Sequence, residues 1–367
     1  MVESPLFQLH VFIFEMGTYR SKEAGMIADA TDDNSPLTIT ALQQALAIYG
    51  RPDLKKATWQ IIDTFVPYAA LWVLLVFMVQ YGYPYWITLA MTIPAGTFLV
   101  RIFIIFHDCC HGSFFTSLRA NRILGNICGI LTFTSFESWR ASHLVHHATA
   151  GDLDRRGVGD VNTMTVEEYL SSPGLKRLAY RLYRNPFIMF FLGPAYMFLI
   201  DQRFSRKGAK KNEKYNVFFT NIAIIAVIAG ASFTIGLKTY LMIQLPIMLV
   251  AGAIGIWMFY IQHQFAGVYW ARHNERDPLK VALLGSSYYK LPKVLQWLTG
   301  NIGLHHIHHI RPRIPNYNLQ QCYDEVPAVQ TVKPLTVRQS LKSVWMNMWD
   351  ENSHSLVSFR SLKALPH

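Results

Sequence analysis

The chain alternates between long apolar runs and blocks of charged residues. Four runs approach the ~20 residues that an α-helix needs to cross a bilayer; they cover residues 61–81, 86–106, 216–237 and 241–261. The first two runs are joined by the uncharged turn YGYPYW, and the last two by GLKTY, which carries one lysine. This pattern predicts an all-α integral membrane protein with four transmembrane helices.

The densest block of lysine and arginine, 15 of the 34 residues, lies between the second and third runs, in residues 108–215. By the positive-inside rule this stretch is cytoplasmic, so four crossings place both termini in the cytoplasm and the stretch itself in a cytosolic helical cap. Residues 123–136 and 187–200 are apolar but short or interrupted, which indicates interfacial or half-buried helices. The capping box TVEE at Thr165–Glu168 predicts a surface helix, and Arg101 is expected to reach toward the membrane interface.

We expect a single domain over residues 1–367, which has a cytosolic N-terminal segment (1–56), the transmembrane helices and cap (57–262), and a cytosolic C-terminal part (263–367). The apolar stretch 6–14 is too short to span a bilayer and shows no cleavable signal pattern. Residues 29–36 read as a polar linker and 37–49 as a short amphipathic helix. A second capping box, Thr336–Gln339, predicts a helix with Leu341, Val344, Trp345 and Met348 on one face.

Composition narrows the class of protein. The 367 residues are 51% hydrophobic, and the formal net charge is +11. That charge would suit a nucleic-acid partner, but the basic residues flank apolar spans and no nucleic-acid motif is present, so we expect none. The four cysteines include no CxxC pair and give no disulfide framework.

Histidines form three clusters whose spacing suits metal binding. His305, His308 and His309 stand at i, i+3 and i+4, so on a helix their rings share one face and can reach a common centre, whereas His306 points away. The same spacing recurs at His143, His146 and His147, and His107 and His111 stand at i and i+4. Eight histidines exceed one tetrahedral site, which predicts two metal ions.

Other metal sites fit this pattern less well. Imidazole suits iron, copper, zinc and nickel, and no clustered thiolates or carboxylates favour another metal. The zincin motif needs a Glu directly after its first histidine, where this chain has Asp108. Soluble di-iron bundles need Glu and Glu-x-x-His pairs, which are missing. A two-metal site with nitrogen ligands remains.

The three clusters and their surroundings resemble a known family. HDCCHGSF, HLVHH followed by ATAGDLDRRGVGDV, and GLHHIHHIRPRIPNY are similar to the three histidine boxes of the integral-membrane fatty acid desaturases, in their bacterial acyl-lipid, delta-12 or omega-3-like branch. The resemblance spans residues 98–319. It implies two iron ions, O2 and two electrons, which together introduce a cis double bond into a fatty acyl lipid, in an enzyme of the bacterial inner membrane.

One histidine outside the boxes is added to the expected ligands. The fourth run carries His263 to the membrane surface that His107 reaches at the end of the second, and the family tends to place a further histidine between its second and third boxes. His273 is expected at the surface. The expected iron ligands are therefore His107, His111, His143, His146, His147, His263, His305, His308 and His309.

Four acids are candidates for orienting these rings: Asp108, Asp152, Asp154 and Asp160. Each either accepts a hydrogen bond from a ligand ring or pairs with a cation of the cap. The acyl chain is expected in an apolar tunnel lined by some of Trp72, Trp86, Trp139, Trp257 and Tyr260, although aromatic residues near span ends are also common interfacial anchors.

The chain lacks a built-in source of electrons, because it has no heme-binding segment, no dinucleotide fingerprint and no cluster-forming cysteines. An external donor such as ferredoxin is expected, attracted to the basic cytosolic face. Two alternatives stay open. One is a related di-iron lipid or carotenoid hydroxylase or ketolase. The other is a non-enzymatic metal-binding membrane protein, which would place histidines within the spans rather than at their ends.

Overall fold

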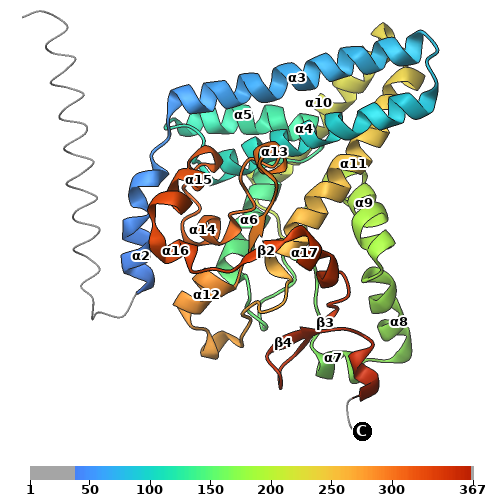
Figure 1. The fold of residues 1–367 in the computed structure, drawn as a ribbon. Coiled ribbons are helices and arrows are strands. Elements are labelled where there is room, and N and C mark those ends of the chain that lie inside the picture. Colours follow the sequence, from blue (N-terminus) through green and yellow to red (C-terminus); the bar gives the residue numbers. More distant parts are fainter. Residues whose placement is uncertain (1–37, 365–367) are drawn as a thin grey trace, which may run out of the picture.

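The computed structural model describes residues 38–364; the interpretations of stretches 6–14 and 29–36 lie outside these residues. Four long helices dominate the described chain (Figure 1). They are α3 (Leu54–Gln80), α4 (Tyr85–His111), α10 (Lys211–Thr234) and α11 (Leu237–His263), and all are long and apolar enough to cross a membrane. The four predicted spans are therefore confirmed.

Each long helix extends beyond the apolar run that predicted it. At 1.5 Å per residue, the 27 residues of α4 and of α11 exceed a hydrocarbon core ~30 Å thick by roughly 10 Å. The extra turns hold His107 and His111 at the end of α4 and His263 at the end of α11. Gly112 ends α4 with φ 65°, a left-handed conformation that favours glycine.

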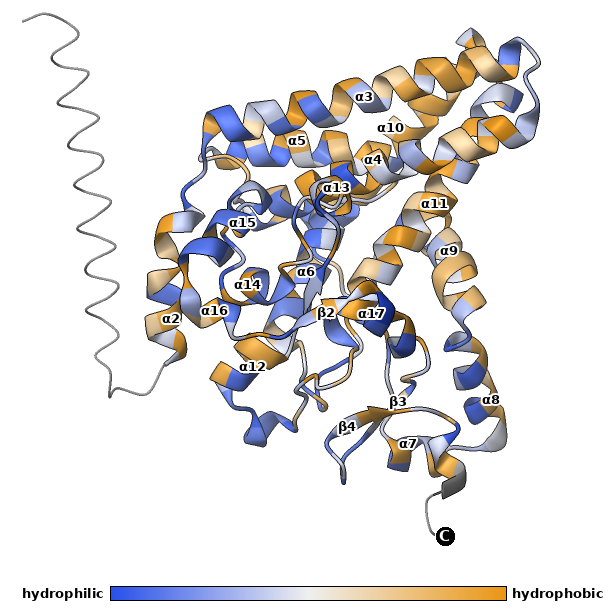
Figure 2. Ribbon diagram, viewed as in Figure 1, coloured by the Kyte–Doolittle hydropathy of each residue, from blue (hydrophilic) through white to orange (hydrophobic). Residues whose placement is uncertain are grey.

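The two helices that carry these histidines pack closely. A Cβ on Gly96 of α4 would lie 2.6 Å from Val250 Cγ1 of α11, so only glycine allows this approach. Most residues in the apolar stretches of α3, α10 and α11 face outward, whereas 56% of those in α4 are buried inside the molecule. Figure 2 shows how apolar residues dominate α4, α10 and α11. Outward apolar surface is what a lipid solvent requires.

The remaining elements form the cap and its edge. Between α4 and α10 lie α5 (Leu118–Leu131), α6 (Phe136–Thr149), α7 (Val166–Leu170), α8 (Gly174–Tyr183), η2 (Ile188–Leu192), α9 (Gly193–Leu199) and η3 (Asp201–Arg203). After α11 lie η4 (His273–Glu275), α12 (Pro278–Leu284), α13 (Lys293–Leu298), α14 (His305–Ile310), α15 (Asn316–Glu325), α16 (Pro327–Gln330), α17 (Val337–Ser343) and η5 (Ser361–Ala364). Before α3 lie α2 (Ile39–Ala45) and η1 (Ala47–Gly50).

Short strands qualify the all-α expectation. β1 (Tyr288–Lys290) pairs in parallel with β2 (Pro334–Thr336), Tyr288 opposite Pro334, and β3 (Met348–Asp350) pairs antiparallel with β4 (Ser355–Val357), Met348 opposite Val357. Both capping boxes are present, at Thr165 and Thr336. The helix after the second is shorter than predicted: α17 ends at Ser343, and Met348 is buried in β3.

Amphipathic helices continue the apolar surface of the spans. On α5, Leu124 and Cys128 are buried against the bundle while Leu118 and Ile123 are exposed, as predicted for a half-buried helix. In 187–200, the apolar side chains of η2 and α9 are likewise divided between inside and outside. One expectation is wrong: Arg101 does not reach the interface but is buried and pairs with Asp63 of α3.

Candidate metal centre

Nine histidines converge where α4 and α11 meet the cap. α4 supplies His107 and His111, α11 supplies His263, and the other six come from two short helices of the cap, α6 and α14. Each of these helices presents its histidines at i, i+3 and i+4, so both place three rings on the side that faces the span ends. The remaining histidine of α14, His306, lies apart: its Nε2 is 3.1 Å from the Val329 carbonyl, as expected for a ring that points away.

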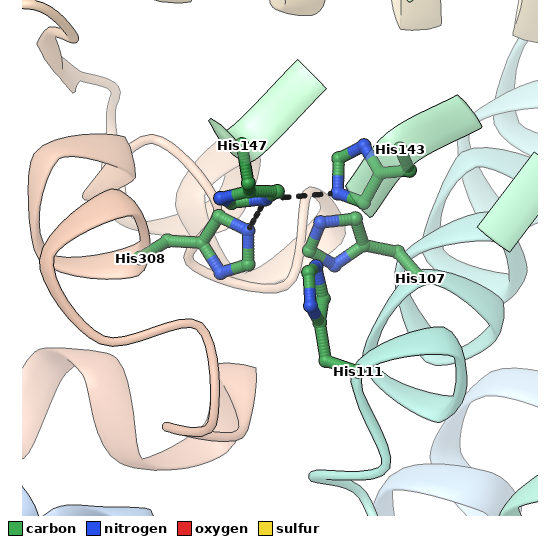
Figure 3. A group of neighbouring side chains, drawn as sticks. All are labelled: His107, His111, His143, His147 and His308. Carbon is green, nitrogen blue, oxygen red and sulfur yellow. Dashed lines mark hydrogen bonds between the residues drawn. The ribbon is translucent and has the colours of Figure 1, made fainter. Parts of the chain in front are cut away.

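The nine rings separate into two adjoining groups. Group A consists of His107, His111, His143, His147 and His308, and group B of His146, His263, His305 and His309. Within each group, one nitrogen per ring lies within 4.8 Å of all the others. Figure 3 shows how the rings of group A, from α4, α6 and α14, point toward one another. The two groups touch, because the rings of His147 and His309 stack 4.2 Å apart.

The second and third boxes are divided between the groups, so the expectation that three rings of one helix reach a common centre is wrong, whereas the first box, His107 and His111, lies wholly in group A. α6 gives His143 and His147 to group A and His146 to group B. α14 gives His308 to group A and His305 and His309 to group B. Each short helix lies between the two groups and contributes to both.

The nitrogen positions fit two cations. His263 Nε2 lies 3.1 Å from His146 Nε2 and 3.0 Å from His305 Nε2. A ring nitrogen carries either one proton or one lone pair, so it cannot donate to one neighbour and accept from the other. Lone pairs directed at a shared metal avoid this conflict, and nitrogens ~2.1 Å from a metal and at right angles are roughly 3.0 Å apart.

Group A repeats this arrangement. His147 Nε2 lies 3.1 Å from His143 Nε2 and 3.0 Å from His308 Nε2. Among the described residues, the buried Nε2 atoms of His107 and His111 have no hydrogen-bond partner. Buried nitrogens without a hydrogen-bond partner fit a role as metal ligands.

Burial keeps these rings in the form that binds metal. Loss of solvent, reinforced by neighbouring rings, holds the pKa of His143, His147, His305, His308 and His309 well below its usual value. Neutral imidazole is the form that binds metal. Burial also lowers the pKa of His306, to about 4.

Two of the four candidate acids contact group histidines, and both fix a ring. His107 Nδ1 lies 3.1 Å from Asp108 Oδ1, and His146 Nδ1 lies 2.5 Å from Asp160 Oδ1. A proton on each Nδ1 that donates to the carboxylate leaves Nε2 with its lone pair for a metal. The carboxylates therefore orient one ring in each group.

The other two acids contact cations and His273. Asp152 Oδ2 lies 2.7 Å from His273 Nδ1 and 3.5 Å from Arg276 Nη1. Asp154 accepts from the His273 backbone and from Arg272, and these two contacts hold its pKa below the usual value. His273 is exposed, as expected, and belongs to neither group.

Sequence reasoning missed the residue that holds Asp108. Asn316, at the start of α15, donates to Asp108 Oδ2 from its backbone nitrogen (2.6 Å) and from Nδ2 (2.8 Å). Its Oδ1 accepts from Gln60 Nε2 of α3 at 2.9 Å. The PRIPNY string that contains Asn316 contributed to the family resemblance but gave no sign of this contact.

The aromatic residues expected in a tunnel lie in different surroundings. The Trp139 ring stacks on His143 at 4.2 Å, and Trp257 is half-buried against Phe190. Trp86 is 71% exposed, which excludes it from an internal tunnel. Tyr260 is buried with its hydroxyl bonded to cap carbonyls.

Comparison with known proteins agrees with this arrangement. A model of the family described as fatty acid desaturase matches residues 84–339. A "Fatty acid desaturase" of Bacillus subtilis is 46% identical over 325 residues, which are 89% of this chain and 92% of that protein. More distant relatives are an "sn-1 oleoyl-lipid 12-desaturase" of Synechocystis (26% over 246 residues; 64% of this chain, 67% of that protein) and an "sn-1 acyl-lipid omega-3 desaturase (ferredoxin)" of Nostoc (24% over 276 residues; 70% of each). A family match that includes all nine histidines, together with the 46% identical relative, shows that the chain belongs to the fatty acid desaturase family and is a membrane-bound enzyme of lipid metabolism.

Proposed function

We propose that the protein introduces a cis double bond into a fatty acyl lipid, with O2 and two electrons from an external donor, at two iron ions held by the nine histidines. The observation that carries the proposal is the convergence of two touching histidine groups at the ends of α4 and α11. Each group offers at least four nitrogens. The acyl C–H bonds are not acidified by any neighbouring group, so acid–base catalysis cannot break them. Bound iron would supply the activation of O2 and the oxidising power.

The protein's own part is orientation and exclusion of water. In group A, Asp108 fixes His107, and Asp160 does the same for His146 in group B. Trp139 stacks on His143, and the Phe259 ring lies 5.1 Å from that of His146, so aromatic surface borders both groups. An apolar border suits an alkyl chain and keeps water from the reacting carbons.

The relatives support the finer parts of the proposal. Two are named for acyl chains of sn-1 lipids, one of them an oleoyl chain, so we propose a membrane lipid whose acyl chain already carries one double bond. One is named with ferredoxin, which supports that class of donor. We place the enzyme in the bacterial inner membrane, with the metal centre on the cytoplasmic side, because the basic residues gather there.

The test is lipid analysis by gas chromatography after expression in a bacterial host that lacks desaturases, together with metal analysis of the purified protein. We expect one new cis double bond, formed only in the presence of O2, and two irons per chain. Hydroxylated or keto products without a new alkene would contradict the proposed reaction. Stoichiometric zinc with activity independent of iron would contradict the proposed cofactor.

A further inference from the structure

A cleft of about 220 Å³ leads from the surface of the cap to both histidine groups. Its inner end holds His147 of group A and His309 of group B, the pair whose rings stack. Neither ring is fully buried, whereas six of the other seven group histidines are. The outer part is lined by Gln43 of α2, by Pro278 and Val281 of α12, and by Arg276. The described residues thus leave a path to the point where the groups meet.

This cleft does not lie on the lipid side. α2, α12 and α14, which form its walls, lie together at the end of the molecule away from the hairpin turns of the spans (Figure 1). An acyl chain of a membrane lipid approaches from the bilayer. A soluble electron carrier approaches from the water, which is the side on which the walls of the cleft lie.

The surface around the cleft is basic. Arg276 lines the cleft, Lys280 adjoins the lining residue Val281 on α12, and Arg311 and Arg313 follow the lining residue Ile310 in the chain. Arg311 Nη1 donates to the Gln43 carbonyl at 3.0 Å, which ties this cation to the cleft wall. Asp152 partly neutralises Arg276, and Asp277 is engaged in capping α12. No carboxylate of the described residues lies within ion-pair distance of the other three cations.

We propose that a small acidic iron–sulfur protein docks on this surface and passes electrons to the metals past His147 and His309. We call it the port surface and define it by Gln43, Arg276, Lys280, Arg311 and Arg313. The proposal rests on the proposed function. Two reduced carriers each lose one electron per turnover: R–CH2–CH2–R′ + O2 + 2 e⁻ + 2 H⁺ gives R–CH=CH–R′ + 2 H2O. Opposite charges would speed encounter and orient the carrier, as is common for transient redox complexes.

The test combines binding and kinetics, with an acidic plant-type [2Fe–2S] ferredoxin as the probe. Lys280→Glu and Arg313→Glu reverse exposed charges of the port surface, and Arg338→Glu, on exposed α17, is the matched control. At low salt we expect each port variant to raise the Kd for the ferredoxin by about five- to tenfold, in metal-free as well as iron-loaded protein, because the reversed charge repels the probe over a short screening distance. The KM of the port variants for ferredoxin should rise in parallel, while their turnover driven by dithionite should stay at the wild-type level. The Arg338→Glu control should keep the wild-type Kd and KM.

Further outcomes separate the docking proposal from the function. Unchanged Kd and KM in both port variants would overturn the port surface even if the wild type makes alkene. A photocrosslinker in place of Gln43 should capture the ferredoxin; capture of residues 1–37 or of a second copy of the chain instead would also overturn it. A wild type that binds the ferredoxin at this surface yet makes no alkene would contradict the proposed function alone.

Discussion

Two histidines close in sequence show how contacts decide a residue's role. The ring of His263 contacts His146 and His305 at 3.1 and 3.0 Å inside group B. The ring of His273, ten residues later, is 47% exposed and contacts the Asp152 carboxylate. We interpret the first as a metal ligand and the second as part of the surface.

We predict that His263→Ala loses at least one iron per chain and most turnover, because no other described residue replaces its nitrogen in group B. His273→Ala should keep its iron and lose less than about half of its turnover, since the exposed His273 belongs to neither group and the buried Asp152 keeps Arg276 as a partner. Iron analysis and alkene yield of the two variants, measured side by side, check this. Full activity of His263→Ala would remove it from the ligands.

Asn316 is a second residue whose role comes from its contacts. We predict that Asn316→Leu lowers the stability of the metal-free protein by roughly 2–3 kcal/mol, because a buried carboxylate loses a donor and Gln60 loses its acceptor. Iron content should fall as well, since Asp108 no longer holds His107 in place. Thermal unfolding and iron analysis measure the two effects, with the exposed Asn274→Leu as control. Stability and iron content equal to wild type would show that Asp108 needs no such support.

At the scale of elements, a buried ion pair joins two spans to the cap. Arg101 of α4 contacts Asp63 Oδ1 at 3.2 Å and donates to Thr64 Oγ1 at 2.9 Å, both on α3. Its guanidinium also lies 4.1 Å over the Trp297 ring of α13. One side chain thus fixes three elements next to the helix end that carries His107.

We predict that Arg101→Met destabilises the protein by about 3 kcal/mol or more, because it leaves the Asp63 charge unpaired in a low-dielectric region. Adding Asp63→Asn should recover part of that loss, since the orphaned charge is removed with its partner. Thermal unfolding in one detergent compares the two single variants and the double variant. A double variant whose loss equals the sum of the single losses would show that the residues are not coupled.

At the scale of the whole molecule, the two sides of the membrane differ. The turns after α3 and α10 are short, whereas the segments that hold the cap, the histidines and most cations lie at the other ends of the spans. The positive-inside rule then gives an orientation.

We predict that reporter fusions in the turns near Pro84 and Lys238 report the outside, and that fusions at Lys207–Lys214 and at the C-terminus report the cytoplasm. A fusion at Lys207–Lys214 found outside would overturn both the orientation and the position of the cap.

The sequence by itself determined the spans and the residues that form the two histidine groups. A lipid solvent leaves backbone groups no partner but their own helix, so long apolar runs such as 86–106 specify helices directly. Helical spacing likewise placed three rings on one face of α6 and of α14. Both are local properties, which depend on a segment of about twenty residues or fewer.

Only the tertiary structure decided to which of the two groups each histidine belongs. Helical spacing cannot tell which centre a ring reaches, because rings at i, i+3 and i+4 diverge on either side of one face. In the fold, His308 of α14 lies against His107 and His111 of α4 in group A, and His305 lies against His263 of α11 in group B. The tertiary structure likewise brings Asp108 and Asp160, but not Asp152 or Asp154, into contact with group histidines. Such pairings join residues as far apart as Gln60 and Asn316. Their energy depends on burial and distance, which local sequence does not specify.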